Sequence, residues 1–282
     1  MKLLVTGSRG QLGRSLVRRA TSETIVALPH RMLDICDPAA VAAALAHHAP
    51  DVVINTAAFT GVDAAETAPE RAFAINAEGA GHVARACADR GIPLLHVSTD
   101  YVFSGDGTTP IPENTEPAPV NAYGRSKAEG ERRVRAAGGT VVRTSWLFAA
   151  FGPGFVQTIM ELATRERELR VVDDQHGRPT WALDLADALL DLAALRDRPA
   201  YIHVCGAGAT TWHAFAAAIV ETVRTFRPIA CERVVPITSA ERASLARRPA
   251  YSVLDTSRAE ALGLPIRPWR PGLARTVAEA LA

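Results

Sequence analysis

Two side chains four residues apart, Tyr123 and Lys127, have the types and the spacing that proton transfer needs. If segment 121–127 (Asn-Ala-Tyr-Gly-Arg-Ser-Lys) opens a helix, they share one face, with their β-carbons about 5–6 Å apart. A free phenol has a pKa near ~10, and an ammonium at ~5 Å favours the phenolate by roughly 3 kcal/mol, or about 2 pKa units. We therefore expect Lys127 to lower the pKa of Tyr123 toward neutrality. An exposed aromatic beside a solvated lysine would give the same pattern, so its context must decide.

Hydroxyl side chains lie upstream of this pair. Segment 94–97 (Leu-Leu-His-Val) is typical of a short buried strand, and Ser98 and Thr99 follow it. Open α/β sheets bind ligands at the carboxyl ends of their strands, so we expect Thr99 to hydrogen-bond a substrate oxygen beside Tyr123. The alternative is that both hydroxyls only cap a turn.

A glycine-rich turn stands near the start of the chain. An apolar run at 3–5 leads to Gly7, Gly10 and Gly13, and the apolar spacing of 14–19 is helical. Glycines allow a tight turn, let backbone N–H groups approach a pyrophosphate and let the helix pack close to the sheet. The order of strand, glycine turn and helix therefore predicts dinucleotide binding, with a plain tight turn as the alternative.

Strands alternate with helices over the first ~145 residues, which predicts an α/β fold of the Rossmann type with a doubly wound parallel sheet. After about residue 150 the alternation breaks down. We expect an NAD(P)-binding domain at 1–150 and a smaller, mainly substrate-binding domain at 151–282, with segments of about 170–205 returning to the main sheet. The expected strands are 24–27, 51–55, 94–97, 140–144, 170–172 and 201–204, and the expected helices are 38–48, 69–90, 121–138, 156–167, 182–195 and 212–225.

Composition narrows the range of partners. The 282 residues are 48% hydrophobic and 22% charged with a formal charge of +1, which favours a small-molecule ligand over nucleic acid or a membrane surface. No apolar run approaches the ~20 residues that cross a bilayer, and we expect a cytoplasmic protein. Its four cysteines have no metal-like spacing, so we expect reduced and mostly buried thiols.

Small residues follow the strand expected at 51–55, at the end where bulk would exclude a cofactor. These are Ala57 and Ala58, followed by Phe59, and mere packing is the alternative explanation. Asn76 falls inside the helix expected at 69–90, where it faces either the cofactor cleft or solvent.

The four tryptophans divide into two groups. Trp146 follows the carboxyl end of a strand and is a candidate for stacking on a sugar or a base. We expect the other three to belong to the core, because large aromatic residues are usually buried; they are Trp181, Trp212 and Trp269.

Taken together, these motifs resemble the dTDP-4-dehydrorhamnose reductase family of the extended short-chain dehydrogenase/reductases. The match covers nearly the whole chain, and the combination is far more specific than any single motif. The motifs are Thr-Gly-x-x-Gly-Gln-Leu-Gly at 6–13, Ala-Ala-Phe-Thr-x-Val-Asp at 57–63, Ser-Thr-Asp-Tyr-Val-Phe at 98–103, Tyr-x-x-x-Lys at 123–127, Arg-Thr-Ser-Trp at 143–146, Asp-Asp-Gln-x-Gly-x-Pro-Thr at 173–180 and Arg-Pro-x-x-Ser-x-Leu-Asp at 248–255.

The resemblance implies a role for each matching residue. Tyr123 would be the catalytic acid, Lys127 its pKa-lowering partner and a ribose ligand, and Thr99 the residue that steers the substrate carbonyl. Asp100 and Trp146 match substrate-contacting positions. The implied reaction is hydride transfer from a reduced nicotinamide to C4 of dTDP-4-dehydro-L-rhamnose, giving dTDP-L-rhamnose. The expected cofactor-binding residues are Gly7, Gly10, Gln11, Leu12, Gly13, His30, Arg31, Asp34, Ala57, Ala58, Phe59, Asn76, Tyr123 and Lys127.

Two positions depart from the family pattern. Some members dimerise through a magnesium ion held partly by a glutamate, but Ser15 stands at that position, so we expect no metal site and leave a homodimer open. Where many relatives have arginine after the second strand, this chain has His30 with Arg31 beside it and no carboxylate until Asp34. Two cationic groups would attract a 2′-phosphate, so we expect NADPH to be preferred about 10-fold and NADH to be accepted.

Three other functions stay open. A nucleotide-sugar dehydratase or epimerase would share the fold, but dehydratases use an Asp-Glu pair where Asp100 is followed by Tyr101, and a phenol does not replace a carboxylate base. A reductase of another dTDP-4-keto-6-deoxyhexose could carry the same motifs, since pocket shape decides the sugar. A non-catalytic regulatory subunit could also keep them.

Overall fold

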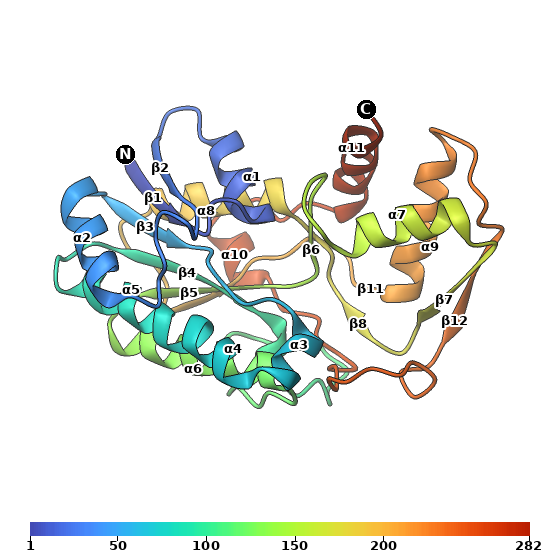
Figure 1. Cartoon of the computed structure of the whole chain (residues 1–282), viewed down its shortest axis with the longest axis horizontal. Helices are drawn as coiled ribbons and strands as arrows, with labels where there is room; N and C mark the ends of the chain where they lie inside the picture. The colour runs from blue at the N-terminus through green and yellow to red at the C-terminus, as the bar shows by residue number, and fades with distance from the viewer.

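Six parallel strands form the centre of the molecule in the computed structural model, which describes residues 1–282 (Figure 1). The order across the sheet is β10-β5-β4-β3-β1-β2. Strand β2 is added on one side of β1 and the later strands on the other, so the strand order reverses between β1 and β3. Ligands of open α/β sheets bind in the crevice at such a switch point. The fold class predicted from the sequence is therefore confirmed. The strands are β1 (Lys2–Thr6), β2 (Thr24–Leu28), β3 (Val52–Asn55), β4 (Leu94–Thr99), β5 (Thr140–Thr144) and β10 (Tyr201–His203).

Helices cover both faces of this sheet, so its strands are apolar on both sides (Figure 1). Helices α1 and α8 pack against each other on one face, and α2, α5 and α6 pack side by side on the other. Their bounds are α1 (Gln11–Arg19), α2 (Pro38–His48), α5 (Ala80–Ala88), α6 (Ala122–Ala136) and α8 (Ala182–Ala194).

The helix expected over 69–90 is three consecutive segments. It begins at Pro69 as predicted, but α4 (Pro69–Phe73) passes into a π-helix, η1 (Ala74–Gly79), before α5 begins. The wide turn carries Asn76, whose amide hydrogen-bonds the backbone of Phe59. Helix α3 (Val62–Thr67) precedes these segments and was not expected.

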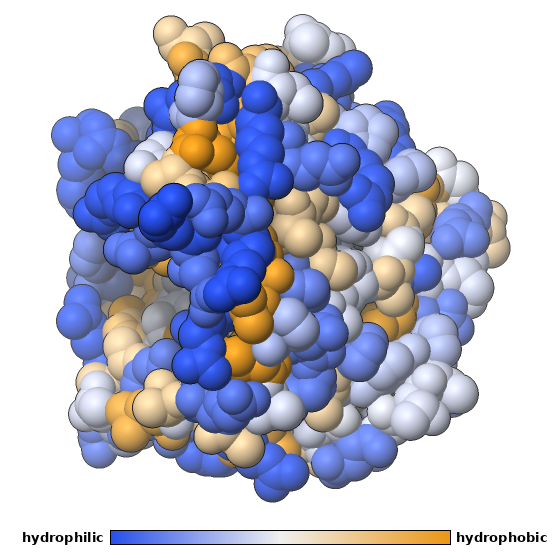
Figure 2. Space-filling view, turned by 90° about the vertical axis from the view of Figure 1, so that its right-hand side faces the viewer, coloured by the Kyte–Doolittle hydropathy of each residue, from blue (hydrophilic) through white to orange (hydrophobic).

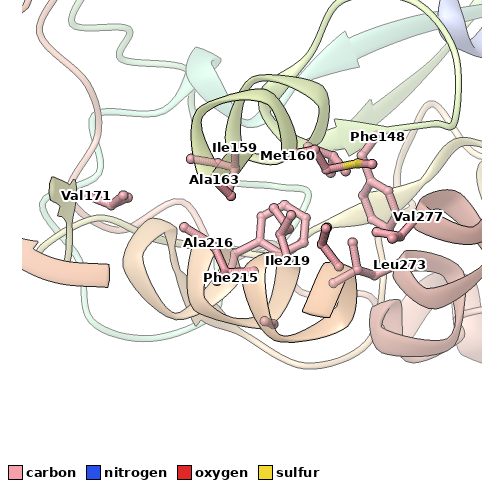
Figure 3. Close-up of a cluster of buried hydrophobic side chains, with 14 of the residues drawn as sticks. Phe148, Ile159, Met160, Ala163, Val171, Phe215, Ala216, Ile219, Leu273 and Val277 are labelled. Carbon is pink, nitrogen blue, oxygen red and sulfur yellow. The ribbon is translucent and has the colours of Figure 1, made fainter. Parts of the chain in front are cut away.

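A second lobe is built from the C-terminal part of the chain. Its core lies between α7, α9 and α11 and includes Phe148, Met160, Phe215 and Leu273 (Figure 3). The helices are α7 (Phe155–Arg165), α9 (Trp212–Arg224) and α11 (Trp269–Leu281), and α10 (Ser257–Ala261) lies beside β10.

Only part of segment 170–205 joins the main sheet. There β10 pairs with β5, with Ile202 opposite Val142, and α8 packs on α1. The strand expected at 170–172 does not return, because β7 (Glu168–Val172) pairs with β12 (Arg233–Ile237) in a separate two-stranded sheet. The remaining strands are two-residue pairings, β6 (Leu147–Phe148) with β9 (Thr180–Trp181) and β8 (His176–Gly177) with β11 (Thr210–Thr211).

The surface of the second lobe is largely hydrophilic, with small apolar patches between charged side chains (Figure 2). No helix of the structure is long and apolar enough to cross a bilayer. The cysteines are all free thiols; three are buried and Cys36 is half-buried.

Candidate functional site

A cavity of about 720 Å³ opens at the carboxyl ends of the central strands and is closed on one side by the second lobe. Its lining residues run from Gly7 to Trp212, so both the N-terminal part of the chain and the second lobe contribute. Among them are most of the predicted site residues: Gly7, Gly10, Gln11, Leu12, Gly13, His30, Asp34, Ala57, Ala58, Thr99, Asp100, Tyr123, Lys127 and Trp146. Three predicted residues do not line it, namely Arg31, Phe59 and Asn76.

The glycine turn lies where the sequence predicted, between β1 and α1. Gly7 has a φ of 64°, and a Cβ there would lie 2.7 Å from the backbone nitrogen of Ala57. A Cβ on Gly13 would lie 2.5 Å from the Cα of Ser8. These close approaches leave the N-terminus of α1 facing the cavity, as binding of a pyrophosphate requires.

Tyr123 stands in the first turn of α6, which begins where the sequence predicted. The side chain of Asn121 caps this helix by accepting a hydrogen bond from the N–H of Gly124 at 2.7 Å. Tyr123 is 9% exposed, and its ring packs edge-on against Tyr101, with 5.6 Å between ring centroids.

The expected lowering of the Tyr123 pKa is wrong. Burial raises the pKa of Tyr123 well above its usual value, although a hydrogen bond with Thr99 acts in the opposite direction. Lys127 does not offset the burial, because its ammonium is held by the carbonyl of Val97 at 2.8 Å and lies 3.3 Å from Nε2 of His96. Tyr123 is therefore a protonated phenol at neutral pH, as a proton donor must be.

Lys127 is almost completely buried, one turn along α6 from Tyr123. Burial lowers the pKa of Lys127 to about 8. Lys127 therefore loses its positive charge only slightly above neutral pH.

Thr99 and Asp100 form a hydrogen-bonded pair. Ser98 and Thr99 are the last residues of β4 and do not follow it as predicted, because β4 pairs with β5 as far as Thr99. The Thr99 hydroxyl donates to Oδ1 of Asp100 at 3.0 Å and accepts from the N–H of Tyr101 at 3.2 Å. Burial raises the pKa of Asp100 to about 6, and its Oδ2 has no hydrogen-bond partner. A buried acceptor oxygen without a partner therefore belongs to a residue that lines the same cavity as Tyr123.

Trp146 lines the cavity with a backbone φ of 46°, which a non-glycine residue rarely adopts. Its ring stacks on Trp212, with centroids 3.6 Å apart and planes 8° apart. The expectation that Trp212 belongs to the core is met only in part: it packs against the core of the second lobe, but it is half-buried and, as the first residue of α9, also lines the cavity. Trp181 and Trp269 are buried, as predicted.

The residues after β2 divide into two groups. His30 and Asp34 line the cavity, with Nδ1 of His30 3.8 Å from Oδ1 of Asp34. Arg31 is exposed and lies outside it. A different arginine, Arg9 of the glycine turn, lines the cavity. The sequence carried a signal for Arg9, since it is a basic residue inside the turn that approaches the cofactor phosphates.

Asn76 lies behind the cavity wall. Its Oδ1 accepts from the N–H of Phe59 at 2.8 Å, and its Nδ2 donates to the carbonyl of Phe59 and to the hydroxyl of Ser126. These bonds fix the loop after β3 and so position Ala57 and Ala58, which do line the cavity.

Comparison with known proteins gives the family. The model of the RmlD substrate binding domain matches residues 1–282. The chain belongs to the RmlD family. A dTDP-4-dehydrorhamnose reductase from Streptomyces griseus is 46% identical, with 96% of this chain and 91% of the relative covered.

Two further relatives bear on the chemistry of this RmlD-family chain. A probable dTDP-4,6-dihydroxy-2-methyloxan-3-one 4-ketoreductase from Streptomyces antibioticus is 42% identical, covering 100% of this chain and 96% of the relative. The crystal structure of dTDP-4-dehydrorhamnose reductase from Bacillus anthracis in complex with NADP is 34% identical, covers 99% of both chains and superposes with a TM-score of 0.93. The resemblance read from the sequence motifs is therefore confirmed.

Proposed function

We propose that this protein reduces the C4 keto group of dTDP-4-dehydro-L-rhamnose with NADPH, giving dTDP-L-rhamnose. The observation that carries the proposal is that Thr99, Tyr123 and Lys127 meet at one cavity that also contains the glycine turn. The names of the Streptomyces griseus and Bacillus anthracis relatives support the same reaction.

The residues present fit a nicotinamide dinucleotide. The turn at Gly7 and Gly13 leaves no room for a side chain, so backbone N–H groups and the α1 N-terminus would receive the pyrophosphate. Ala57 and Ala58 keep the adjoining wall small. When bound, the cofactor supplies the hydride that reduces the ketone.

Tyr123, Thr99 and Asp100 would handle the oxygen of the substrate carbonyl. The Thr99 hydroxyl orients that oxygen, and the phenol of Tyr123 gives it a proton as negative charge develops. Asp100 offers its unpartnered Oδ2 to a sugar hydroxyl. We assign Lys127 the ribose hydroxyls of the cofactor and Trp146, stacked on Trp212, the sugar or base of the substrate.

The division of labour between the two lobes follows from these assignments. We propose that residues 1–150, extended by α8 and β10, bind the cofactor and that the remainder of 151–282 binds the dTDP-sugar. The cavity between them takes residues from both parts, including Gly10 and Trp212.

A second candidate function is reduction of another dTDP-4-keto-6-deoxyhexose. The Streptomyces antibioticus relative, named for a different ketosugar, favours it. The two candidates share every residue named above, because sugar identity depends on the shape of the pocket.

The deciding experiment compares initial rates of NADPH oxidation and product stereochemistry across a panel of dTDP-4-keto sugars. We expect the highest kcat/KM with dTDP-4-dehydro-L-rhamnose. The assay is run with and without EDTA to test for magnesium. Ser15 has no carboxylate to bind the metal, and its hydroxyl donates to the carbonyl of Gln11 at 2.9 Å, so we expect equal rates. A higher kcat/KM for another sugar would select the second candidate.

The same panel separates the remaining alternatives. Formation of a 4-keto-6-deoxy sugar from dTDP-glucose without net cofactor oxidation would identify a dehydratase and contradict the proposal. Absence of turnover with every sugar, in a protein that binds NADPH, would identify a regulatory subunit. Size-exclusion chromatography of the same sample tests for the homodimer.

A further inference from the structure

A buried histidine lies directly beneath the site, on the strand that carries Thr99. His96 is fully buried on β4, and its two ring nitrogens face different partners. Nδ1 lies 3.0 Å from Nδ2 of Asn55 on β3, and Nε2 lies 3.3 Å from Nζ of Lys127 on α6. The imidazole therefore connects the sheet to the lysine of the site.

The orientation of the Asn55 amide is set by its other neighbours. Its Oδ1 accepts from the N–H of Ala57 at 3.2 Å and from the hydroxyl of Thr6 at 2.6 Å. Turning the amide over would place its NH₂ group against the N–H of Ala57, and two donors would then face each other. The NH₂ group of Asn55 therefore points to His96, and Nδ1 of His96 must accept its hydrogen bond.

This assignment fixes the proton of the imidazole. Complete burial and the nearby Lys127 hold the pKa of His96 well below its usual range, so the ring is neutral and carries one proton. With Nδ1 accepting, that proton is on Nε2 and points at Nζ of Lys127. An ammonium at Lys127 would face this N–H as a second donor, whereas a neutral amine would accept its hydrogen bond.

We propose that His96 is a positioning residue that keeps its proton on Nε2 and thereby favours the neutral amine of Lys127 over the ammonium. The tautomer rests on the hydrogen-bond geometry alone. Its importance for turnover rests on the proposed function, in which Lys127 binds the ribose hydroxyls of the cofactor.

Other charged groups around Lys127 act in the opposite direction or are held elsewhere. Glu131, on the same helix, raises the pKa of Lys127, but its carboxylate is paired with Arg143 of β5 at 2.6 Å. Tyr123 lies one turn away on α6, and Asp100 lines the same cavity. His96 is thus the group on β4 that opposes the ammonium.

The first experiment determines the tautomer in the intact protein. Histidine labelled with ¹³C and ¹⁵N is incorporated, and long-range ring correlations distinguish Nε2–H from Nδ1–H by NMR. The His96 signals are assigned by their loss in His96→Leu, or by distance-dependent contacts to β4 if that variant does not fold. We expect the Nε2–H form at pH 7. An Nδ1–H tautomer or an imidazolium would overturn the proposal. This NMR measurement needs no turnover, so its result is independent of the proposed reaction.

The second experiment measures the effect on Lys127. We expect the alkaline fall of kcat/KM, which reports loss of the ammonium near pH 8 in the wild type, to move up by about 0.5–1 pH unit in His96→Leu. The matched control is His203→Leu, which also replaces a buried sheet histidine, one that contacts Arg143 and not Lys127. A purely structural role would lower activity without moving the midpoint. An unchanged or lower midpoint in His96→Leu, or the same upward shift in the control, would overturn the proposal.

Discussion

Tyr123 and Asp100 are acids whose protons are held more tightly in the protein than in water. Burial raises the pKa of both, although each accepts or makes hydrogen bonds that act in the opposite direction. A site that must deliver a proton benefits from a donor that stays protonated until the oxygen of the substrate becomes basic. Burying these two groups lowers the free energy of unfolding, and favourable contacts elsewhere in the fold offset that loss.

Replacing the phenol of Tyr123 tests its role directly. Tyr123→Phe keeps the ring that packs against Tyr101 and removes the proton donor. We expect kcat to fall by about 10²–10⁴-fold while the affinity for NADPH changes little. Steady-state kinetics and cofactor titration by fluorescence measure the two effects. Near wild-type turnover would remove Tyr123 from the mechanism.

Arg9 tests the origin of cofactor preference. It lines the cavity from inside the glycine turn, whereas Arg31 lies outside. We expect Arg9→Ala to lower the NADPH/NADH ratio of kcat/KM by about 5–10-fold, because one exposed charge-assisted contact contributes about 1 kcal/mol or slightly more. Arg31→Ala is the matched control and should leave the ratio unchanged. A change in the Arg31 variant alone would restore the prediction made from the sequence.

Asp100 tests the cost of burying a carboxyl group. Its pKa rises from 3.8 to about 6, so between these values the native state binds more protons than the unfolded chain. The contribution of Asp100 to the free energy of unfolding is therefore highest below about pH 4. It falls by about 2–3 kcal/mol as the pH rises through about 6.

Asp100→Asn removes this titration and keeps an oxygen for Thr99. We expect the variant to be more stable than the wild type at pH 7 and to lose that advantage at pH 4, as denaturant titrations at both values would measure. Its reductase activity should fall, because the free acceptor oxygen is lost. An equal stability difference at the two pH values would contradict the raised pKa.

At the scale of the elements, α6 and the π-helix η1 touch backbone to backbone. A Cβ on Gly130 would lie 2.1 Å from the carbonyl oxygen of Asn76, an atom that cannot move without disturbing the loop held by Asn76. We expect Gly130→Ala to lower the free energy of unfolding by about 2–3 kcal/mol. Gly107→Ala is the control, since no atom lies within 4 Å of its added Cβ. Equal stability of the two variants would show that the contact relaxes.

The sequence predicted long elements and missed short ones for a physical reason. The helix predicted over 121–138 ends near paired glycines, and the structure has it at Ala122–Ala136. Two-residue strands such as Thr180–Trp181 have no periodicity to detect, because tertiary pairing alone defines them. The π turn at Ala74–Gly79 depends on Asn76 bonding a distant loop, which local propensity does not encode.

The same limit applies to the site. Tyr123, Lys127 and Thr99 follow from type and spacing, and the structure brings all three to the cavity. The sequence predicts Arg31 from its position after the second strand, but it cannot show which way a side chain leaves a turn, and the structure places Arg9 at the cavity and Arg31 outside it. Size alone predicts that a tryptophan is buried, and only the packing of the second lobe on the sheet turns the ring of Trp212 to the cavity.

At the scale of the whole molecule, the main sheet is closed late in the sequence. Its first five strands are complete at Thr144, but the sixth, β10, begins at Tyr201 after an excursion into the second lobe. β5 is buried throughout in the finished protein, with β10 covering its outer edge. An uncovered strand edge readily pairs with another chain.

This late closure has a consequence for a chain still on the ribosome. The residues between Thr144 and Tyr201 take about 3–11 s to synthesise at 5–20 residues per second, and for that time β5 is an open edge of the sheet. We expect a fragment ending before β10 to aggregate at a lower concentration than the full chain, as light scattering would show; equal solubility would count against it. Synthesis of the three residues of β10 therefore ends the period in which the β5 edge of a nascent chain can pair with another copy of the protein.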